Sequence, residues 1–589
     1  MLKMFKNFTK KDWLIVFIVV LLISFQVWLD LKLPDYMSTI TRLIQTDGST
    51  ILEILKQGGF MLLCALGSLG SAVIIGYLTS RLSANFSYNL RKKIFKKVSL
   101  FSMKEIKAFE TSSLITRTTN DVTHIEMFIS MGLQMLIKAP ILAIWAVSKI
   151  LNKNLEWSLL TLSGVVILLI IIGIIIFIVY PRFEKVQKLT DKLNDVTREN
   201  LTGIRVIRAF NAEEFEYNRF NKVNTDLTNM QMFNQKCFAI LSPVMSFVMQ
   251  GLTLGIYIIG AIIINKAGML EKINLFSDMV VFTSYGIQVI AAFLMLAMIF
   301  MILPRAGVSA RRINEVLDSD VSIKDGTFDG KTKQIGTVEF KNVSFKYPNA
   351  LNSEEYLIKN LNFKVNKGET IAFIGSTGSG KSTIINLIPR FYDATEGEIL
   401  VDGINVKDYK EESLHNKIGY VPQKAVMFTG TVKSNVCYGE NGKKEVSREK
   451  LKEAIDIAQA TDFVNSMDKT YDAHIARDGT NISGGQKQRL SIARAIARDP
   501  EIYIFDDSFS ALDYKTDLNL RKELKKYTKD ATVIIVAQRI GTIISSDKII
   551  VLDKGNCVGM GTHKELLKSC DVYKEIALSQ LSKEELENA

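Results

Sequence analysis

Residues 375–383 form a glycine-rich loop whose residue types and spacing suit phosphate binding. The loop follows an apolar strand-like run and precedes a helix-like run, and its members are Gly375, Ser376, Thr377, Gly378, Ser379, Gly380, Lys381, Ser382 and Thr383. In this pattern backbone N–H groups wrap the phosphates of a nucleotide, Lys381 reaches the β and γ phosphates, and the Ser382 hydroxyl ligates Mg²⁺. The strand, loop and helix order predicts a site for ATP and Mg²⁺.

Further side chains suit the same chemistry. Asp506 ends the apolar run EIYIFDD, where a carboxylate holds a metal ion through its water shell, and Asp507 follows directly. Tyr347 precedes the nucleotide-binding region and is a candidate for stacking on adenine. The alternative for Tyr347 is an ordinary packed tyrosine of a strand.

A second anion-binding element opens the helical stretch that follows Asn481. Its residues are Ser483, Gly484, Gly485 and Gln486. A helix N-terminus with a serine and two glycines favours negative charge. One chain with a phosphate loop and a separate phosphate-facing helix start suggests a site that is shared between two copies of the fold.

These groups must be positioned by two unlike halves of the chain. From about residue 336 the sequence alternates strand-like runs, turns and helical segments, which is an α/β pattern. Before residue 304 there are six apolar stretches, each long enough to cross a bilayer core of about 30 Å. They are residues 13–29, 58–80, 129–148, 157–180, 237–265 and 279–304.

Charge supports this division. Residues 1–320 carry 34 Lys and Arg against 23 Asp and Glu, a net charge of +11, whereas residues 321–589 carry 39 against 38, a net charge of +1. The basic residues gather in the segments after the second and fourth apolar stretches. Because basic loops stay on the cytoplasmic side, both termini and the α/β half are expected in the cytoplasm. The basicity reports topology, so no nucleic-acid partner is expected.

The basic segments are helical in composition, so we expect them to extend the membrane helices and each to carry a turn, the second of them near residues 201–216. Residues 1–12 are either an amphipathic helix on the membrane or ordinary basic flanks. Lys138 lies within an apolar stretch, where it is either a functional charge inside the membrane or, as we expect, a side chain that extends toward the cytoplasmic end. Gln134, Gln250 and Gln288 either line a cavity or join helices.

With the motifs GSTGSGKST, YVPQ, NISGGQ, YIFDD and SALD, and six helices before the nucleotide-binding region, the whole chain resembles an ATP-binding cassette (ABC) half-transporter of the exporter type. The resemblance implies a six-helix transmembrane domain followed by an α/β P-loop NTPase (ABC) domain. It makes Tyr347 the adenine-stacking aromatic, Gln423 a further Mg²⁺ ligand, and Asp513 part of a loop between the two sites. It also makes 483–486 the signature that completes the site of a partner subunit. It further implies that the cytoplasmic turns lie near residues 114–122 and 207–216.

Two residues depart from the pattern of the family. The family usually has Glu where this chain has Asp507, and His where it has Gln538. Aspartate withdraws the carboxylate by one methylene, and glutamine cannot acquire the charge of a histidine. These catalytic positions therefore predict a degenerate ATP site and low activity of the chain alone.

The domains expected are an N-terminal segment 1–12, a transmembrane domain 13–304, a linker 305–334, an ABC domain 335–580 and a polar tail 581–589. The function expected is ATP-driven export of hydrophobic or amphipathic compounds across the plasma membrane, as one half of a heterodimer. Three alternatives stay open: an exporter-fold siderophore importer, a homodimeric exporter, and a regulatory subunit that senses nucleotides.

Overall fold

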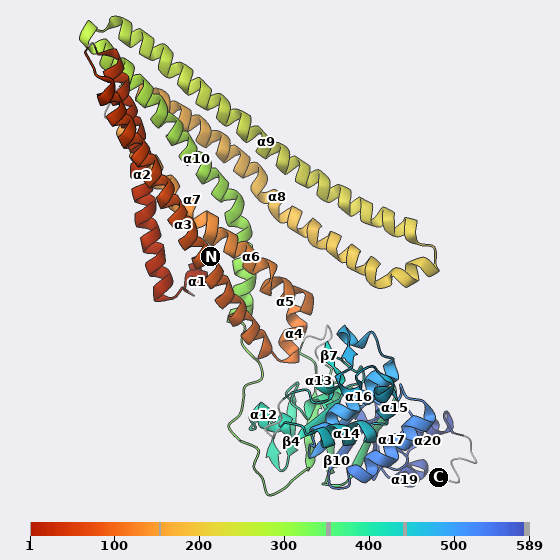
Figure 1. The fold of residues 1–589 in the computed structure, drawn as a ribbon. Coiled ribbons are helices and arrows are strands. Elements are labelled where there is room, and N and C mark those ends of the chain that lie inside the picture. Colours follow the sequence, from red (N-terminus) through yellow and green to blue (C-terminus); the bar gives the residue numbers. More distant parts are fainter. Residues whose placement is uncertain are drawn as a thin grey trace. The chain divides into compact units, whose positions relative to one another are not determined.

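The computed structural model describes residues 2–6, 8–46, 48–151, 155–348, 355–439 and 445–581. The chain divides into two compact units, which Figure 1 shows coloured along the sequence. One unit comprises Met1–Ser99 and Ser112–Ser319, and the other comprises Leu100–Thr111 and Asp320–Ala589. Almost all of the predicted polar tail, 581–589, lies outside the described residues.

The N-terminal unit is helical. Its helices are α1 (Leu2–Phe5), α2 (Lys10–Gln45), α3 (Ile51–Ser99), α5 (Thr111–Thr118), α6 (Asn120–Met127), the π-helix η1 (Phe128–Gly132), α7 (Leu133–Leu151), α8 (Leu155–Ala209), α9 (Glu213–Lys266) and α10 (Met269–Asp318). Among the described residues, six helices are long and apolar enough to cross a membrane, which confirms the predicted number of spans. With 55 residues, α8 is about 80 Å long at 1.5 Å per residue, far more than a bilayer core.

The two predicted turns have different outcomes. Helices α8 and α9 lie side by side and are joined through Phe210, Asn211 and Ala212, inside the predicted range 207–216 (Figure 1). The first prediction was wrong, because α3 ends at Ser99 and the chain turns there and again at Glu110, whose φ is 59°. The predicted range 114–122 holds only the break between α5 and α6 at Thr119.

Polar side chains join the membrane helices. Lys138 of α7 forms an ion pair with α2, because its Nζ lies 3.4 Å from Asp30 Oδ2. Gln288 of α10 donates to the Asp30 carbonyl at 3.4 Å, and Gln134 of α7 donates to the Thr79 hydroxyl of α3. Both glutamines therefore join helices, one of the two roles left open for them.

The C-terminal unit is built on two main sheets. An antiparallel sheet has the order β2 (Ile358–Val365), β1 (Val338–Phe345), β4 (Glu396–Val401) and β5 (Ile404–Asn405). A six-stranded sheet has the order β12 (Asn556–Gly561), β11 (Lys548–Asp553), β3 (Thr370–Gly375), β10 (Thr532–Val536), β9 (Ile502–Asp506) and β6 (Ile418–Val421). Only β12 is antiparallel to its neighbour in the larger sheet. A small pair joins β7 (Gly430–Thr431) to β8 (His474–Ile475).

Short helices accompany these sheets. They are α4 (Met103–Phe109), α11 (Lys381–Leu387), α12 (Glu411–Asn416), α13 (Val432–Val436), α14 (Arg448–Ile457), α15 (Thr461–Ser466), η2 (Thr470–Asp472), η3 (Arg477–Gly479), α16 (Gly484–Ala497), α17 (Tyr514–Tyr527), α18 (Ile540–Ile543), α19 (His563–Ser569) and α20 (Asp571–Leu578).

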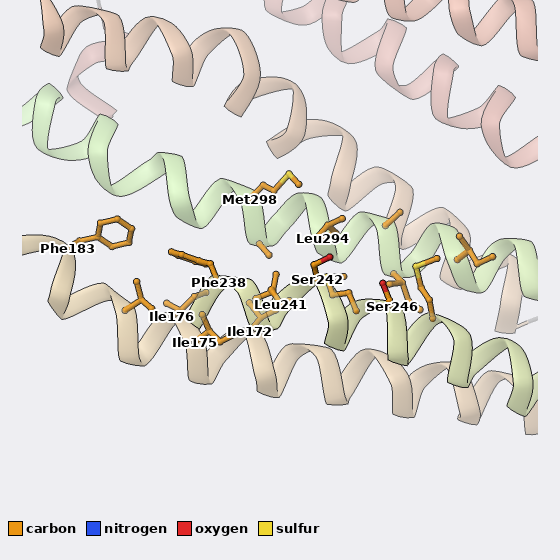
Figure 2. Close-up of a pocket in the computed structure, with 17 residues that line it drawn as sticks. Ile172, Ile175, Ile176, Phe183, Phe238, Leu241, Ser242, Ser246, Leu294 and Met298 are labelled. Carbon is orange, nitrogen blue, oxygen red and sulfur yellow. The ribbon is translucent and has the colours of Figure 1, made fainter. Parts of the chain in front are cut away.

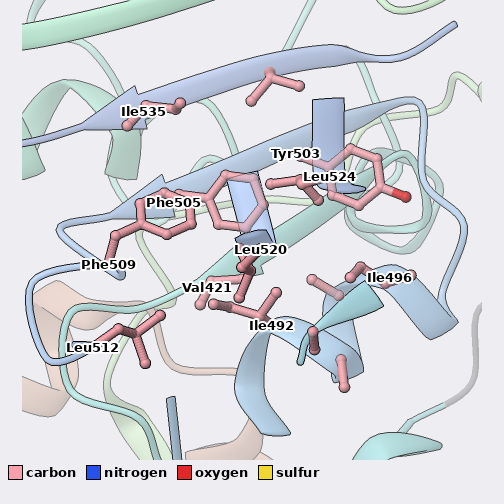
Figure 3. Close-up of a cluster of buried hydrophobic side chains, with 14 of the residues drawn as sticks. Val421, Ile492, Ile496, Tyr503, Phe505, Phe509, Leu512, Leu520, Leu524 and Ile535 are labelled. Atoms are coloured by element: carbon pink, nitrogen blue, oxygen red, sulfur yellow. The ribbon is translucent and has the colours of Figure 1, made fainter. Parts of the chain in front are cut away.

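Strand β9 shows how the larger sheet holds the core on both faces. Its Tyr503 and Phe505 belong to one buried cluster, which also contains Ile492 of α16 and Leu520 of α17 (Figure 3). The alternate residues of β9 belong to a second cluster that includes residues of the antiparallel sheet. Because successive side chains of a strand point to opposite faces, both faces of β9 are covered. The strand end that carries Asp506 is thereby fixed.

Candidate nucleotide site and membrane cavity

Four neighbouring parallel strands bring the predicted nucleotide-binding residues to one edge of the larger sheet. Strand β3 ends at Gly375, where the glycine-rich loop begins, and β9 ends at Asp506. Gln538 follows β10 by two residues, and Gln423 follows β6 by two residues. The carboxyl ends of parallel strands lie at the same edge, which is where open α/β sheets bind ligands. The fold therefore gathers residues that are up to 163 positions apart in the sequence.

The loop 375–380 requires glycine at its ends. Gly375 has φ of 155°, and a Cβ there would lie 2.1 Å from the Leu552 carbonyl oxygen. Gly380 has φ of 97°, and its Cβ would lie 2.3 Å from Ile358 Cδ1. Helix α11 starts at Lys381, directly after Gly380, so its first N–H groups face the loop. This arrangement is a cradle for an anion.

Lys381 is held within that cradle. Its Nζ donates to the carbonyl oxygens of Gly375 and Ser376 at 2.8 Å each. Burial lowers the pKa of Lys381, because the charged ammonium loses hydration. A bound phosphate would give this partly desolvated ammonium an anionic partner.

Ser382 and Asp506 meet as a metal site would require. The Ser382 hydroxyl donates to Asp506 Oδ1 at 2.9 Å. Burial raises the pKa of Asp506, since this carboxylate is removed from water. Two oxygen donors at the phosphate cradle, one of them a buried carboxylate, are the chemistry that Mg²⁺ prefers. The residues present therefore fit the metal.

Asp507 is held by two amide side chains. Its Oδ2 accepts hydrogen bonds from Gln538 Nε2 at 2.8 Å and from Gln423 Nε2 at 3.4 Å. The Asp507 backbone has φ of 45° and its N–H donates to the Val536 carbonyl at 2.9 Å, so its direction is fixed as well. Burial raises the pKa of Asp507. The two positions that depart from the family pattern, Asp507 and Gln538, are thus bonded to each other.

Tyr347 lies two residues after β1 and beside the glycine-rich loop. Its hydroxyl is 3.0 Å from the Thr383 hydroxyl, and its ring meets Phe345 and Tyr392 edge to face, at centroid distances of 5.0 and 5.2 Å. The ring is half-buried. Tyr347 is therefore packed against its neighbours, which was one of the two roles predicted for it. Its position beside the glycine-rich loop also suits the second role, stacking on adenine.

Ser483 caps a helix, as the sequence predicted. It is the N-cap of α16, where its hydroxyl accepts from Gln486 N–H at 3.3 Å while Gln486 Oε1 accepts from Ser483 N–H at 2.8 Å. A Cβ on Gly485 would lie 3.2 Å from the Ala511 carbonyl, so the loop before Asp513 packs closely there. Asp513 caps α17 by accepting from Thr516 N–H at 3.0 Å. That backbone hydrogen bond lowers the pKa of Asp513.

Within the described residues no hydrogen bond or ion pair joins 483–486 to the loop 375–383.

The N-terminal unit contains an apolar cavity that the sequence did not reveal. Its volume is about 450 Å³ and it lies among α8, α9 and α10 (Figure 2). The lining residues are Ile172, Ile175, Ile176, Val179, Phe183, Phe238, Leu241, Ser242, Met245, Ser246, Met249, Ile287, Ile290, Ala291, Leu294, Ala297 and Met298. None of them is charged.

Ser242 and Ser246 are the polar residues of this lining, and their side chains point into the cavity (Figure 2). Other hydroxyls of these helices bond to their own backbone, as Thr253 does to the Met249 carbonyl at 2.9 Å. Neither Ser242 nor Ser246 makes such a bond within the described residues. Their hydroxyls are therefore available to a molecule in the cavity.

Comparisons with known proteins cover both units. Residues 15–301 match the family described as ABC transporter transmembrane region, and residues 358–510 match the family described as ABC transporter. An uncharacterized ABC transporter ATP-binding protein of Mycobacterium tuberculosis is 36% identical over 560 residues, which are 92% of this chain and 93% of that protein. A putative multidrug export ATP-binding/permease protein of Staphylococcus aureus is 33% identical over 524 residues, which are 85% of each chain.

A solved structure has the same fold. The structure of a bacterial Atm1-family ABC exporter with ATP bound superimposes with a TM-score of 0.83 at 22% identity. The match covers 98% of this chain and 100% of that chain. The six-helix domain followed by an α/β nucleotide-binding domain is thus confirmed.

Proposed function

The chain belongs to the ABC transporter family and is an ATP-hydrolysing, multi-pass membrane half-transporter with the exporter fold, and we propose a more specific role for it. In this proposal it is the half of a heterodimeric exporter that carries the degenerate ATP site. The partner is a second half-transporter that carries Glu at the position of Asp507. ATP binding at this chain's own site is retained, while turnover takes place at the site to which this chain lends residues 483–486.

The bonding of Asp507 is the observation that carries the proposal. A base for hydrolysis must reach a water molecule beside the γ-phosphate, and a retreat of about 1 Å can cost on the order of 10²-fold in rate. Asp507 is one methylene shorter than Glu, and both Gln538 and Gln423 donate to its Oδ2. The Asp507 carboxylate therefore has a shorter reach than that of Glu and already accepts two hydrogen bonds.

The remaining residues suit binding of Mg²⁺ and ATP. In this proposal the cradle 375–380 and Lys381 hold the phosphates, Tyr347 stacks on adenine, and Ser382, Asp506 and Gln423 hold Mg²⁺. When bound, Mg²⁺ neutralises charge on the phosphates. Ser483 and Gln486 fix the start of α16, which then faces the γ-phosphate of the partner's nucleotide.

The cavity of the N-terminal unit supports a hydrophobic substrate. It is lined by apolar and sulfur-containing side chains with two free hydroxyls, so it suits an uncharged or amphipathic molecule. The multidrug export named for the S. aureus relative is in keeping with this. The basic segments after the second and fourth spans support the topology that we propose in the plasma membrane, with both termini in the cytoplasm, because basic loops stay on the cytoplasmic side.

One experiment separates this proposal from a nucleotide-sensing subunit. Ser483→Ala is introduced into the complex of this chain with its partner, reconstituted in liposomes, and ATP turnover is measured together with movement of a lipophilic dye. We expect both to fall, because the serine belongs to the active site formed with the partner. Unchanged turnover and transport would favour the sensor and refute the proposal. Dye accumulating on the opposite side would instead support an importer.

A further inference from the structure

A short helix from the N-terminal half of the sequence belongs to the C-terminal unit. Helix α4 (Met103–Phe109) lies within Leu100–Thr111, which groups with the nucleotide-binding residues. Ser102 and Glu105 form a capping box at its start, and the Ser102 hydroxyl is 2.9 Å from that of Ser322. Glu105 is buried. The start of the helix is therefore stabilised by its own capping box and by the contact with Ser322.

Lys107 of this helix lies over two aromatic rings. Its Nζ is 4.7 Å from the ring centroid of Tyr347 and 5.5 Å from that of Tyr392. The planes of the two rings are 85° apart, so they form two walls of a corner that contains the ammonium. A hydrogen bond to Tyr392 raises the pKa of Lys107, so the side chain stays charged at neutral pH. Electron-rich faces attract such a cation.

Tyr347 cannot easily turn away from this ammonium. Its hydroxyl is bonded to Thr383 at the start of α11, and Phe345 and Tyr392 border its ring. A base that stacked on the face covered by Lys107 would have its centroid about 4.5 to 7 Å from that of the ring, in the space where the ammonium stands at 4.7 Å. A base and an ammonium cannot share it.

We infer that Lys107 competes with adenine for the face of Tyr347, so that this lysine weakens ATP binding until it is displaced. The inference rests on the proposed function, in which Tyr347 stacks on adenine. Helix α4 lies in the turn of the chain between α3 and α5. When ATP displaces Lys107 from the ring of Tyr347, this turn loses one of its contacts with the nucleotide-binding residues.

The expected change in ATP affinity is small because Lys107 is exposed to solvent. A cation–π contact at an exposed site changes an equilibrium by about two- to fivefold. Removing the ammonium while keeping an apolar stem, as in Lys107→Met, is therefore expected to tighten ATP binding by about two- to fivefold. Lys104 on the same helix makes no contact with either ring in the described structure, so Lys104→Met is a charge-matched control.

The test is calorimetric titration of the purified full chain with ATP in EDTA, which prevents hydrolysis. We expect Lys107→Met to bind ATP more tightly than the wild type and Lys104→Met to bind equally. Inorganic tripolyphosphate, which has no base, should bind both Lys107→Met and wild type equally. In a Tyr347→Leu background, Lys107→Met should have no further effect on ATP.

Each other outcome has a definite meaning. Weaker ATP binding by Lys107→Met would show that the lysine is a nucleotide ligand, and equal binding would show that it does not compete; either result overturns the inference. A gain that persists in Tyr347→Leu, or that extends to tripolyphosphate, overturns it too. Failure of the wild-type chain to bind ATP at all would refute the proposed function itself.

Discussion

Restoring the family residues at two positions should create a hydrolytic site in this chain. The change is Asp507→Glu together with Gln538→His. Glutamate carries the carboxylate one methylene further, and histidine removes the amide that now donates to Asp507 Oδ2 at 2.8 Å. Both obstacles identified at this carboxylate, its short reach and its bond to Gln538, are thereby removed.

The magnitude follows from these two obstacles. A misplacement of about 1 Å costs on the order of 10²-fold, and loss of general-base action costs about 10²- to 10⁴-fold. We expect the double variant to hydrolyse ATP at least about 10²-fold faster than the wild-type chain. Asp507→Glu alone should recover less, because the amide of Gln538 is still present to hold the longer carboxylate.

The assay is phosphate release by the purified full chain in lipid nanodiscs that hold two copies, since residues 483–486 of one copy must complete the site of the other. Lys381→Ala in the double variant serves as the control, since it removes the ammonium of the phosphate cradle and should abolish the gain. The reasoning would be refuted if the wild-type chain already turned over as fast as the double variant. It would also be refuted if the gain survived Lys381→Ala.

Three further predictions concern other parts of the chain. Ser246→Trp fills the membrane cavity and should reduce export of a lipophilic dye severalfold while basal ATP turnover is kept, as measured in vesicles; unaltered export would contradict the assignment of the cavity. Lys138→Met leaves Asp30 without its cation, so thermal unfolding in detergent should shift to lower temperature by a few degrees, and Asp30→Asn with Lys138→Met should recover part of the shift. Burial lowers the pKa of His563 below its ordinary 6.5, so its neutral form stabilises the fold above about pH 6.5 and that stability is lost as the pH falls; fluorescence-detected unfolding from pH 8 to 5 should show a smaller loss in His563→Gln.

The membrane half was largely predictable because the bilayer requires long apolar helices. The six spans follow from composition alone. The first turn was not predictable, since residues 100–111 contain neither Gly nor Pro. Its position depends on contacts of Ser102 and on the positive φ of Glu110, whereas Thr119 marks only a helix break.

The nucleotide site was predictable where strand ends define it. Gly375 and Asp506 are each the last residue of an apolar strand, and the edge of a parallel sheet brings such residues together. The bond between Asp507 and Gln538 could not be predicted from their spacing, nor could the position of Lys107 over Tyr347, 240 residues further along. Such contacts depend on packing between distant segments, for which a single sequence carries no local signal.

Steady-state ATP turnover of the purified chain, alone and combined with a half-transporter that carries Glu at the position of Asp507, tests the central claim most directly. The account predicts that the chain alone hydrolyses no faster than its Lys381→Ala variant, and that the combination shows turnover stimulated by hydrophobic substrates. Full, substrate-stimulated turnover by the chain alone would contradict the assignment of a degenerate site in a heterodimer.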